Sequence, residues 1–223
     1  MTIAIALALP DGALLFADGR RSHIDDSSFT TTNSHNKINR LTDDLSVATY
    51  GLEPITSACP QTIKHAAQPD WNCSKYFLLA SIYLPQIFAE LKGQLSTSID
   101  LTNTNLETGL VFAGHDHGHP FIGRLLFAGE RQVVAQIIRQ PGYAAILGGF
   151  SCNAEDILLQ NINRHPNISH TEENDYGAKE VGALKDVISQ TIRDVSKHEP
   201  TVGGTISFIS IRHKNKTETG TLT

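Results

Sequence analysis

The sequence has 223 residues, of which 40% are hydrophobic and 18% charged, and its formal net charge is −5. A negative net charge gives no electrostatic footprint for nucleic acid, and no apolar run approaches the ~20 residues that a membrane-spanning helix needs. The length suits one sizeable core, so we expect a single domain over residues 1–223.

The cysteines and the amino-terminal residues both favour a cytoplasmic location. Three cysteines are scattered along the chain without the spacing of metal ligands, which fits structural thiols in a reducing compartment. The first residues lack the basic region and the small-residue cleavage site of a secretory signal. We therefore expect a cytoplasmic protein that binds neither nucleic acid nor membrane.

The first fifty residues predict a strand-rich opening. Pro10-Asp11-Gly12 is a turn signal between two apolar runs, so the chain begins with a hairpin. Residues 20–34 are polar and are expected to form a surface loop. The four predicted strands cover residues 2–9, 13–18, 37–41 and 45–50.

Helical signals follow this opening. Residues 57–67 predict a helix in which Pro60 fits only the first turn. Residues 74–92 carry apolar side chains at helical spacing, and Pro85 is expected to kink that helix. Gly93 is a plausible residue at which the helix ends.

The second half of the chain repeats the order of strands followed by two helices. Strands are predicted over 110–114, 121–127, 133–138, 143–147 and 205–211, and helices over 151–163 and 175–197. Residues 213–223 are polar and are expected to be a flexible tail. Runs of strands separated by helix pairs are typical of the α+β class. We predict a four-layer αββα sandwich of two stacked, mainly antiparallel sheets flanked by helix pairs.

Thr2 follows the initiator Met1 and precedes an apolar, β-branched run. Methionine aminopeptidases remove Met when the next side chain is small, so we expect a mature chain that begins with Thr2. A free α-amine has a pKa near ~7.7–8.0 and can accept a proton at neutral pH. The residue would then carry a base beside its own hydroxyl, which is one way to activate a weak oxygen nucleophile.

Three further residues fit a site built around Thr2. Asp18 ends the second strand of the opening hairpin, so it returns to the end where Thr2 lies. Lys37 begins the third strand, and its ammonium would stabilise a developing alkoxide and lower the pKa of the terminal amine. Asp18 would pair with that ammonium. Gly51 ends the fourth strand, where a backbone N–H can act as an oxyanion donor.

At these positions the sequence resembles the proteasome β-type family of N-terminal-nucleophile hydrolases, which includes the bacterial heat-shock-locus threonine protease and other bacterial proteasome homologues. The family pattern is matched by Thr2, Ala17-Asp18-Gly19, Lys37 and Gly51. The spacings from Thr2 to Asp18 and from Lys37 to Gly51 agree with the family. The loop between Asp18 and Lys37 is a few residues longer.

The resemblance implies a threonine-type endopeptidase that needs no cofactor or metal. Thr2 would be the nucleophile and its amine the base, Lys37 and Asp18 would tune the site, and the Gly51 N–H would stabilise the tetrahedral intermediate. Family members form rings, hexameric or heptameric and stacked in pairs, and cleave unfolded polypeptides delivered by an ATPase or activator. The first specificity pocket would be lined by Arg21, His35, Thr49 and Glu53.

The sequence departs from the family at two supporting positions. Family members commonly carry a Ser just before the Gly of a glycine pair, and another Ser, with an Asp three residues earlier, before the last strand. The residues concerned here are Leu147, Gly148, Gly149 and the slightly later Ser151, and then Glu199 and Val202. Because supporting groups orient a site, two alternatives stay open. One is a weak or inactive ring subunit with a scaffold role, and the other a small-amide acylase on the same fold.

A histidine-rich segment, residues 115–119, is a candidate metal site. His115, His117 and His119 alternate around Asp116, and alternating histidines can converge on a metal if the segment is extended. Gly118 interrupts the series and predicts a turn between two strands. An exposed turn is the favoured interpretation, and no metal is expected.

Overall fold

The computed structural model describes residues 2–25, 28–51, 53–68, 70–95, 107–148, 153–165, 178–213 and 215–222. Two five-stranded sheets contain most of the strands, and all neighbouring strands in them run antiparallel. In spatial order the first sheet is β10 (Ala144–Leu147), β1 (Ala4–Leu9), β2 (Gly12–Asp18), β11 (Ile206–Arg212) and β12 (Asn215–Leu222). The second sheet is β5 (Ile38–Arg40), β6 (Leu45–Tyr50), β7 (Glu107–Asp116), β8 (His119–Ala128) and β9 (Arg131–Ile138).

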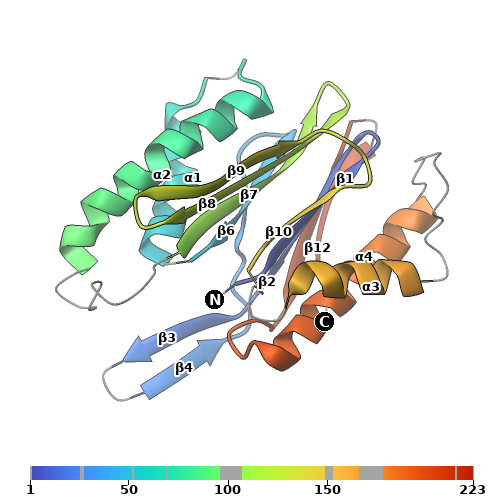
Figure 1. The fold of residues 1–223 in the computed structure, drawn as a ribbon. Coiled ribbons are helices and arrows are strands. Elements are labelled where there is room, and N and C mark those ends of the chain that lie inside the picture. The colour runs from blue at the N-terminus through green and yellow to red at the C-terminus, as the bar shows by residue number, and fades with distance from the viewer. Residues whose placement is uncertain are drawn as a thin grey trace.

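The two sheets stack face to face between two helix pairs (Figure 1). Helices α1 (Glu53–Ala66) and α2 (Cys73–Leu95) cover the outer face of the second sheet. Helices α3 (Ala154–Arg164) and α4 (Ala178–His198) cover the outer face of the first. The predicted αββα sandwich is therefore confirmed.

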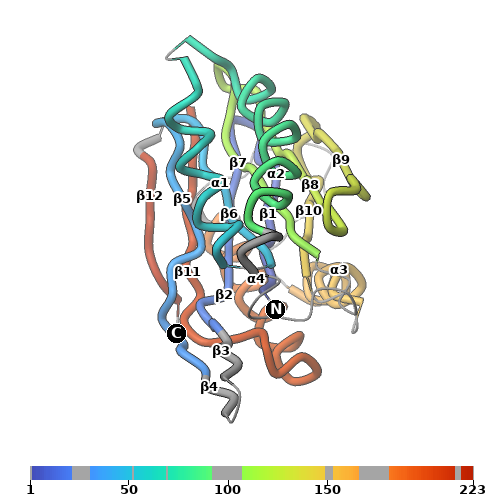
Figure 2. The backbone as a smooth tube through the Cα atoms, turned by 90° about the vertical axis from the view of Figure 1, so that its left-hand side faces the viewer, coloured from blue at the N-terminus to red at the C-terminus, as the bar shows by residue number. Residues whose placement is uncertain are grey.

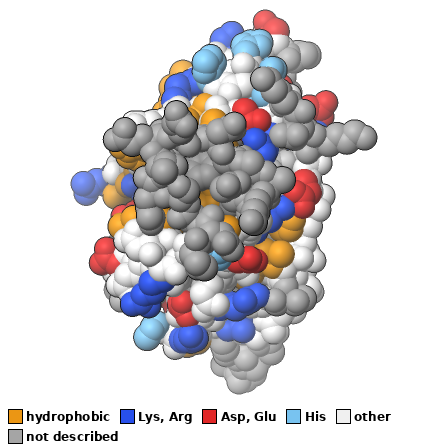
Figure 3. Space-filling view, turned by 90° about the vertical axis from the view of Figure 1, so that its right-hand side faces the viewer, with side chains coloured by type: hydrophobic (Ala, Val, Ile, Leu, Met, Phe, Trp, Pro, Cys, Tyr) orange, Lys and Arg blue, Asp and Glu red, His pale blue; other side chains and the backbone are white. Residues whose placement is uncertain are grey.

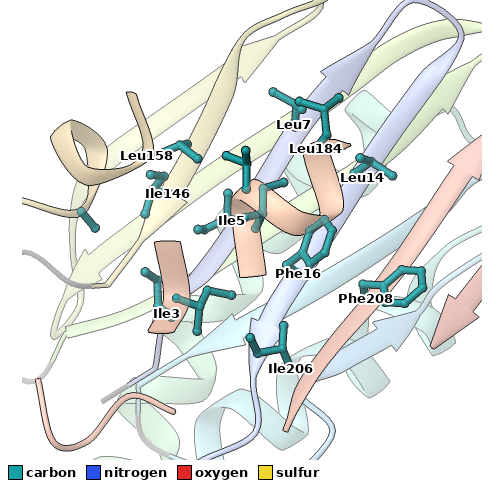
Figure 4. Close-up of a cluster of buried hydrophobic side chains, with 14 of the residues drawn as sticks. Ile3, Ile5, Leu7, Leu14, Phe16, Ile146, Leu158, Leu184, Ile206 and Phe208 are labelled. Atoms are coloured by element: carbon teal, nitrogen blue, oxygen red, sulfur yellow. The ribbon is translucent and has the colours of Figure 1, made fainter. Parts of the chain in front are cut away.

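Side chains of alternating size build the three buried layers. From Ile3 to the end of β1, the large residues at 3, 5, 7 and 9 face α3 and α4, and the alanines at 4, 6 and 8 face the other sheet. Figure 4 shows the first of these layers, in which Phe16 stacks on Phe208 with ring centroids 5.8 Å apart. Phe112 and Phe121 belong to the layer beneath α1 and α2. Because alanines fill much of the layer between the sheets, the two sheets can approach closely.

A short ribbon departs from the sequence prediction. The residues expected to form a loop over 20–34 contain β3 (Arg21–Asp25) and β4 (Ser28–Thr32), which pair only with each other. Figure 1 shows this ribbon projecting away from both sheets. The consecutive threonines at 30–32 are β-branched and favour extended backbone, and their polarity masked that preference.

The carboxyl-terminal residues also differ from expectation. The tail predicted over 213–223 contains β12, which pairs with β11 along the edge of the first sheet. Figure 2 shows β12 beside β11 and the nearby β5. Leu222 packs against the buried cluster and Glu218 accepts from Lys185 Nζ at 2.7 Å, so both apolar contact and an ion pair hold this strand.

Helices α1 and α2 extend beyond their predicted bounds. Helix α1 begins at Glu53, so Pro60 lies inside it and not in its first turn. Pro60 is buried, as are Ile55 and Ile63 of the same helix, and the burial of its apolar ring offsets the missing backbone donor. Helix α2 continues past Gly93 to Leu95, because a single glycine costs only about 1 kcal/mol in a helix interior.

The described surface carries charges of both signs, as the similar numbers of basic and acidic residues in the sequence lead one to expect. On the face seen in Figure 3, positively and negatively charged side chains of the described residues are interspersed. Among the helices of the described ranges, none combines the length and the hydropathy required to cross a bilayer.

The close contact between the sheets predicts that added volume at Ala6 is poorly tolerated. Ala6 is fully buried in the layer between the sheets. Ala6→Leu should lower the free energy of unfolding by about 1–3 kcal/mol, because overpacking shifts its neighbours. Ala135→Leu, the same change at an exposed position of β9, should stay within about 0.5 kcal/mol of the parent. Urea denaturation followed by circular dichroism measures both, and equal effects would contradict the close packing.

Candidate active site

The β1–β2 hairpin places Asp18 beside the peptide that joins Thr2 and Ile3. Ala4 pairs with Ala17 in the register, and the Asp18 N–H donates to the Ile3 carbonyl at 3.1 Å. In return, the Ile3 N–H donates to Asp18 Oδ1 at 2.9 Å. Asp18 is fully buried and Thr2 is 6% exposed. The predicted return of Asp18 to the Thr2 end is therefore correct.

Lys37 reaches the same carboxylate from the start of the second sheet. Its Nζ donates to Asp18 Oδ1 at 3.0 Å and to the Arg20 carbonyl at 2.5 Å. The Thr49 N–H donates to the Lys37 carbonyl at 3.2 Å, which anchors its main chain to β6. The Lys37 ammonium and the Ile3 N–H thus share one oxygen, which places a buried cation next to the Thr2–Ile3 peptide.

Two further backbone donors complete the surroundings of the carboxylate. Asp18 Oδ2 accepts from the Arg20 N–H at 3.2 Å and from the Gly203 N–H at 3.0 Å. Four donors from separate segments therefore converge on one buried side chain. Such full satisfaction is what a charge removed from water requires.

Burial acts on both members of the Asp18–Lys37 pair. Burial raises the pKa of the Asp18 carboxyl, and the Lys37 ammonium and the N–H groups of Ile3 and Gly203 oppose this rise. Burial lowers the pKa of Lys37, the Asp18 charge opposes the change, and the Arg20 cation adds to it. A lysine whose pKa lies below its usual value is a feature often found at functional sites.

Gly51 and Gly148 occupy positions that only glycine fits. Gly51 has φ +109°, and a Cβ there would overlap the Glu107 carbonyl oxygen. Its backbone is exposed, as an oxyanion donor requires. Gly148 has φ +89°, and a Cβ there would overlap the Thr2 carbonyl oxygen. Gly148, named above as a candidate for the first supporting position, therefore lies against Thr2 and leaves no room for a hydroxyl-bearing side chain.

The second supporting position is an apolar one. Val202 is fully buried and belongs to the cluster under α3 and α4. Glu199 is 5% exposed, and its carbonyl accepts from the Val202 N–H at 2.9 Å within the same turn. Leu147, the other candidate for the first supporting position, is buried between the sheets. Met1, Gly149 and Ser151 lie outside the described residues.

The four predicted pocket residues are only partly brought together. Arg21 and Glu53 form an ion pair that joins β3 to the first turn of α1. The His35 N–H donates to the Gly19 carbonyl at 3.0 Å, and Thr49 is buried beside Lys37. Four cavities of about 430 to 650 Å³ are lined by other residues. A formed specificity pocket therefore stays a prediction.

Two groups at this end of the molecule were not predicted from the sequence. The Arg20 guanidinium donates hydrogen bonds to the turn that precedes β11. In the sequence, only its position directly after Asp18-Gly19 points to this residue. Tyr50 Oη donates to Glu107 Oε2 at 3.4 Å. Burial raises the pKa of Tyr50, and the charges of Glu107 and Glu199 add to the rise. No spacing pattern in the sequence predicts the pairing of Tyr50 with Glu107.

Among the described residues, the histidine-rich turn contacts a neighbouring carboxylate, and the two described cysteines are buried. His115 is 6% exposed, and its Nε2 lies 3.5 Å from Asp44 Oδ1. Within the described ranges, no group of three or more potential ligands is arranged to hold a metal ion. Cys59 is buried, which raises the pKa of its thiol to about 12 and keeps it protonated.

The sequence matches no model of a known protein family and no curated protein. The case for a function therefore depends on the residues of this chain alone.

The shared carboxylate predicts an asymmetry between its two charged partners. Asp18→Asn leaves the Lys37 ammonium buried without a counter-charge and should lower the free energy of unfolding by about 3–5 kcal/mol at pH 7. Lys37→Met leaves Asp18 with three backbone donors and should cost less. The double variant should lose less than the sum of the two, because the charges act as a pair. Urea denaturation measures all three, and strict additivity would contradict the coupling.

Proposed function

We propose that this protein is a threonine-type peptidase whose nucleophile is Thr2 after removal of Met1. The observation that carries the proposal is the buried Lys37 ammonium, which shares Asp18 Oδ1 with the Ile3 N–H and so lies beside the Thr2–Ile3 peptide. A fixed cation at this place lowers the energy of an alkoxide on the adjacent residue. Asp18 holds the cation in place.

In the proposed reaction, Thr2 Oγ1 attacks the carbonyl carbon of a peptide bond and its proton passes to the α-amine of Thr2. The Gly51 N–H donates to the oxyanion of the tetrahedral intermediate. The intermediate collapses to an ester on Thr2, and the leaving amine takes the proton from the α-ammonium. Water then hydrolyses the ester, which releases the carboxylic acid product and restores the hydroxyl.

We further propose that the chain assembles with itself into hexameric or heptameric rings, stacked in pairs, in the cytoplasm. Leu78 and Ile82 are four residues apart on one face of α2, and both are more than half exposed. Val133 and Ile137 on β9 are 52% and 42% exposed. Large apolar side chains left in water support association between subunits. A closed chamber would restrict the substrate to unfolded polypeptide delivered by an ATPase or activator.

A second candidate is a ring subunit of the same fold that does not turn over substrate. The observations that favour it are Gly148, which leaves no room for a side chain beside Thr2, and the apolar Val202. In this case Thr2 would be processed but unreactive. The two candidates differ in what happens when an electrophile enters the site.

Labelling with a peptide epoxyketone separates these candidates. The probe reacts with a hydroxyl and an α-amine on the same residue, so the processed protein should gain one probe mass on the peptide that begins at Thr2. Thr2→Ala should abolish labelling, and Thr2→Ser should retain it. Thr191→Ala, at a buried threonine of α4, is the control and should label like the parent.

Intact mass spectrometry under denaturing and native conditions completes the test. Retention of Met1 in assembled protein would rule out the peptidase. Loss of Met1 without labelling would favour the scaffold subunit. A labelled monomer would favour a small-amide acylase over a chambered peptidase.

The rate of labelling should fall on the alkaline side at a pH below 10.5, the usual pKa of lysine. Lys37 loses its charge as the pH rises, and burial brings that loss to lower pH. Lys37→Arg should label more slowly at neutral pH, yet lack this alkaline decline, because arginine stays protonated. Stopped-time labelling from pH 6 to pH 11 measures both profiles. A parent rate that does not fall by pH 10.5 would contradict the role of the lysine charge.

A further inference from the structure

Arg20 ties the turn before β11 to the site. Its Nη1 donates to the Pro200 carbonyl at 2.6 Å and to the Val202 carbonyl at 3.0 Å. Its Nε donates to Asn33 Oδ1 at 3.0 Å. The planar guanidinium therefore joins two segments that are far apart in the sequence, and its rigid fork suits several acceptors at once.

The main chain of the same residue touches both charged partners. The Arg20 N–H donates to Asp18 Oδ2 at 3.2 Å, and the Arg20 carbonyl accepts from Lys37 Nζ at 2.5 Å. A displacement of Arg20 would therefore move a donor of the carboxylate and an acceptor of the ammonium together.

The turn itself returns a donor to the carboxylate. Gly203 donates its N–H to Asp18 Oδ2 at 3.0 Å, and a Cβ on Gly203 would lie 3.1 Å from Arg20 Cζ. Gly203 has φ +135° and Gly204 has φ +77°, so the two glycines let the turn approach both Arg20 and Asn33. The guanidinium thus binds two carbonyls of this turn, and the Asp18 carboxylate binds one of its N–H groups.

We infer that Arg20 is a positioning residue of the proposed peptidase, in which it fixes the Glu199–Gly203 turn and, with it, the N–H that Gly203 donates to Asp18. This inference rests on the proposed function for its kinetic consequence. Its structural consequence, the position of the turn and the charge on Lys37, is measurable whether or not the protein is a peptidase.

Electrostatics supports this role. Burial is the main cause of the lowered pKa of Lys37, and the Arg20 cation lowers it further. Loss of the guanidinium removes a like charge and therefore raises the pKa of Lys37. The hydrogen exchange of the Gly203 amide follows the position of the turn separately from this loss of charge.

Arg20→Met tests the inference, with Arg212→Met as the matched control. Arg212 also joins a strand end to a turn, through Asp11 Oδ1 at 2.8 Å, but it lies at the opposite end of β11. In Arg20→Met we expect the maximal rate of epoxyketone labelling to fall about 10²-fold with little change in probe affinity, because the site is misplaced while the contacts to the probe remain. Arg20→Lys, which keeps the charge, should fall between this variant and the parent.

Two measurements follow the turn and the charge without any reaction. A ¹⁵N NMR titration of the Lys37 side chain should give a higher pKa in Arg20→Met than in the parent. The Gly203 amide should exchange with solvent about 10-fold faster or more, since its hydrogen bond opens more often. Arg212→Met should change neither quantity.

The outcomes separate the two hypotheses. If the parent is not labelled, the peptidase fails, and the titration and exchange still decide the role of Arg20. If Arg20→Met and Arg212→Met give the same titration, exchange and labelling, the inference is wrong. If Arg20→Met does not fold, Asn33→Ala, which removes the acceptor of Nε and keeps the Arg20 charge, replaces it and should change the exchange and the labelling in the same direction.

Discussion

One buried carboxylate organises the end of the molecule that carries the candidate site. Asp18 accepts hydrogen bonds from Ile3, Arg20, Lys37 and Gly203, which belong to four separate segments of the chain. Strand pairing brings donors near this carboxylate, but the negative charge of Asp18 is what makes the convergence of all four favourable. A neutral side chain of the same size could not compensate a buried ammonium, so the positions of Lys37 and of the turn before β11 both depend on Asp18.

The small residues between the sheets make this convergence geometrically possible. Asp18 extends from the first sheet and Lys37 from the second, so their contact needs two sheets that stack closely. Alanines at 4, 6, 8 and 48 keep the layer thin, and larger side chains are confined to the layers under the helices. The alternation of large and small residues along β1 therefore serves both the core and the site.

The sequence predicts the architecture better than it predicts the surroundings of the site. Apolar periodicity predicts the sandwich, and the turn signal of the first hairpin predicts that Asp18 lies near Thr2. Both predictions depend on local sequence patterns. The strands β3, β4 and β12 were not predicted, because their threonines are polar, as loop residues usually are, although they favour extended backbone. The role of Arg20 was not predicted for a different reason. Its guanidinium donates to a backbone carbonyl 180 residues away in the sequence, and a carbonyl has no sequence signature of its own.

The contact between Gly148 and the Thr2 carbonyl limits how this site can change. A mutational path that adds a hydroxyl through position 148 must first displace the opening strand, so every intermediate along it would fold poorly. Position 202 offers an easier route, because a smaller polar side chain there would leave the backbone in place. Under the proposed function, laboratory evolution toward higher turnover would therefore accumulate its first substitutions around the last strand and leave the glycine unchanged.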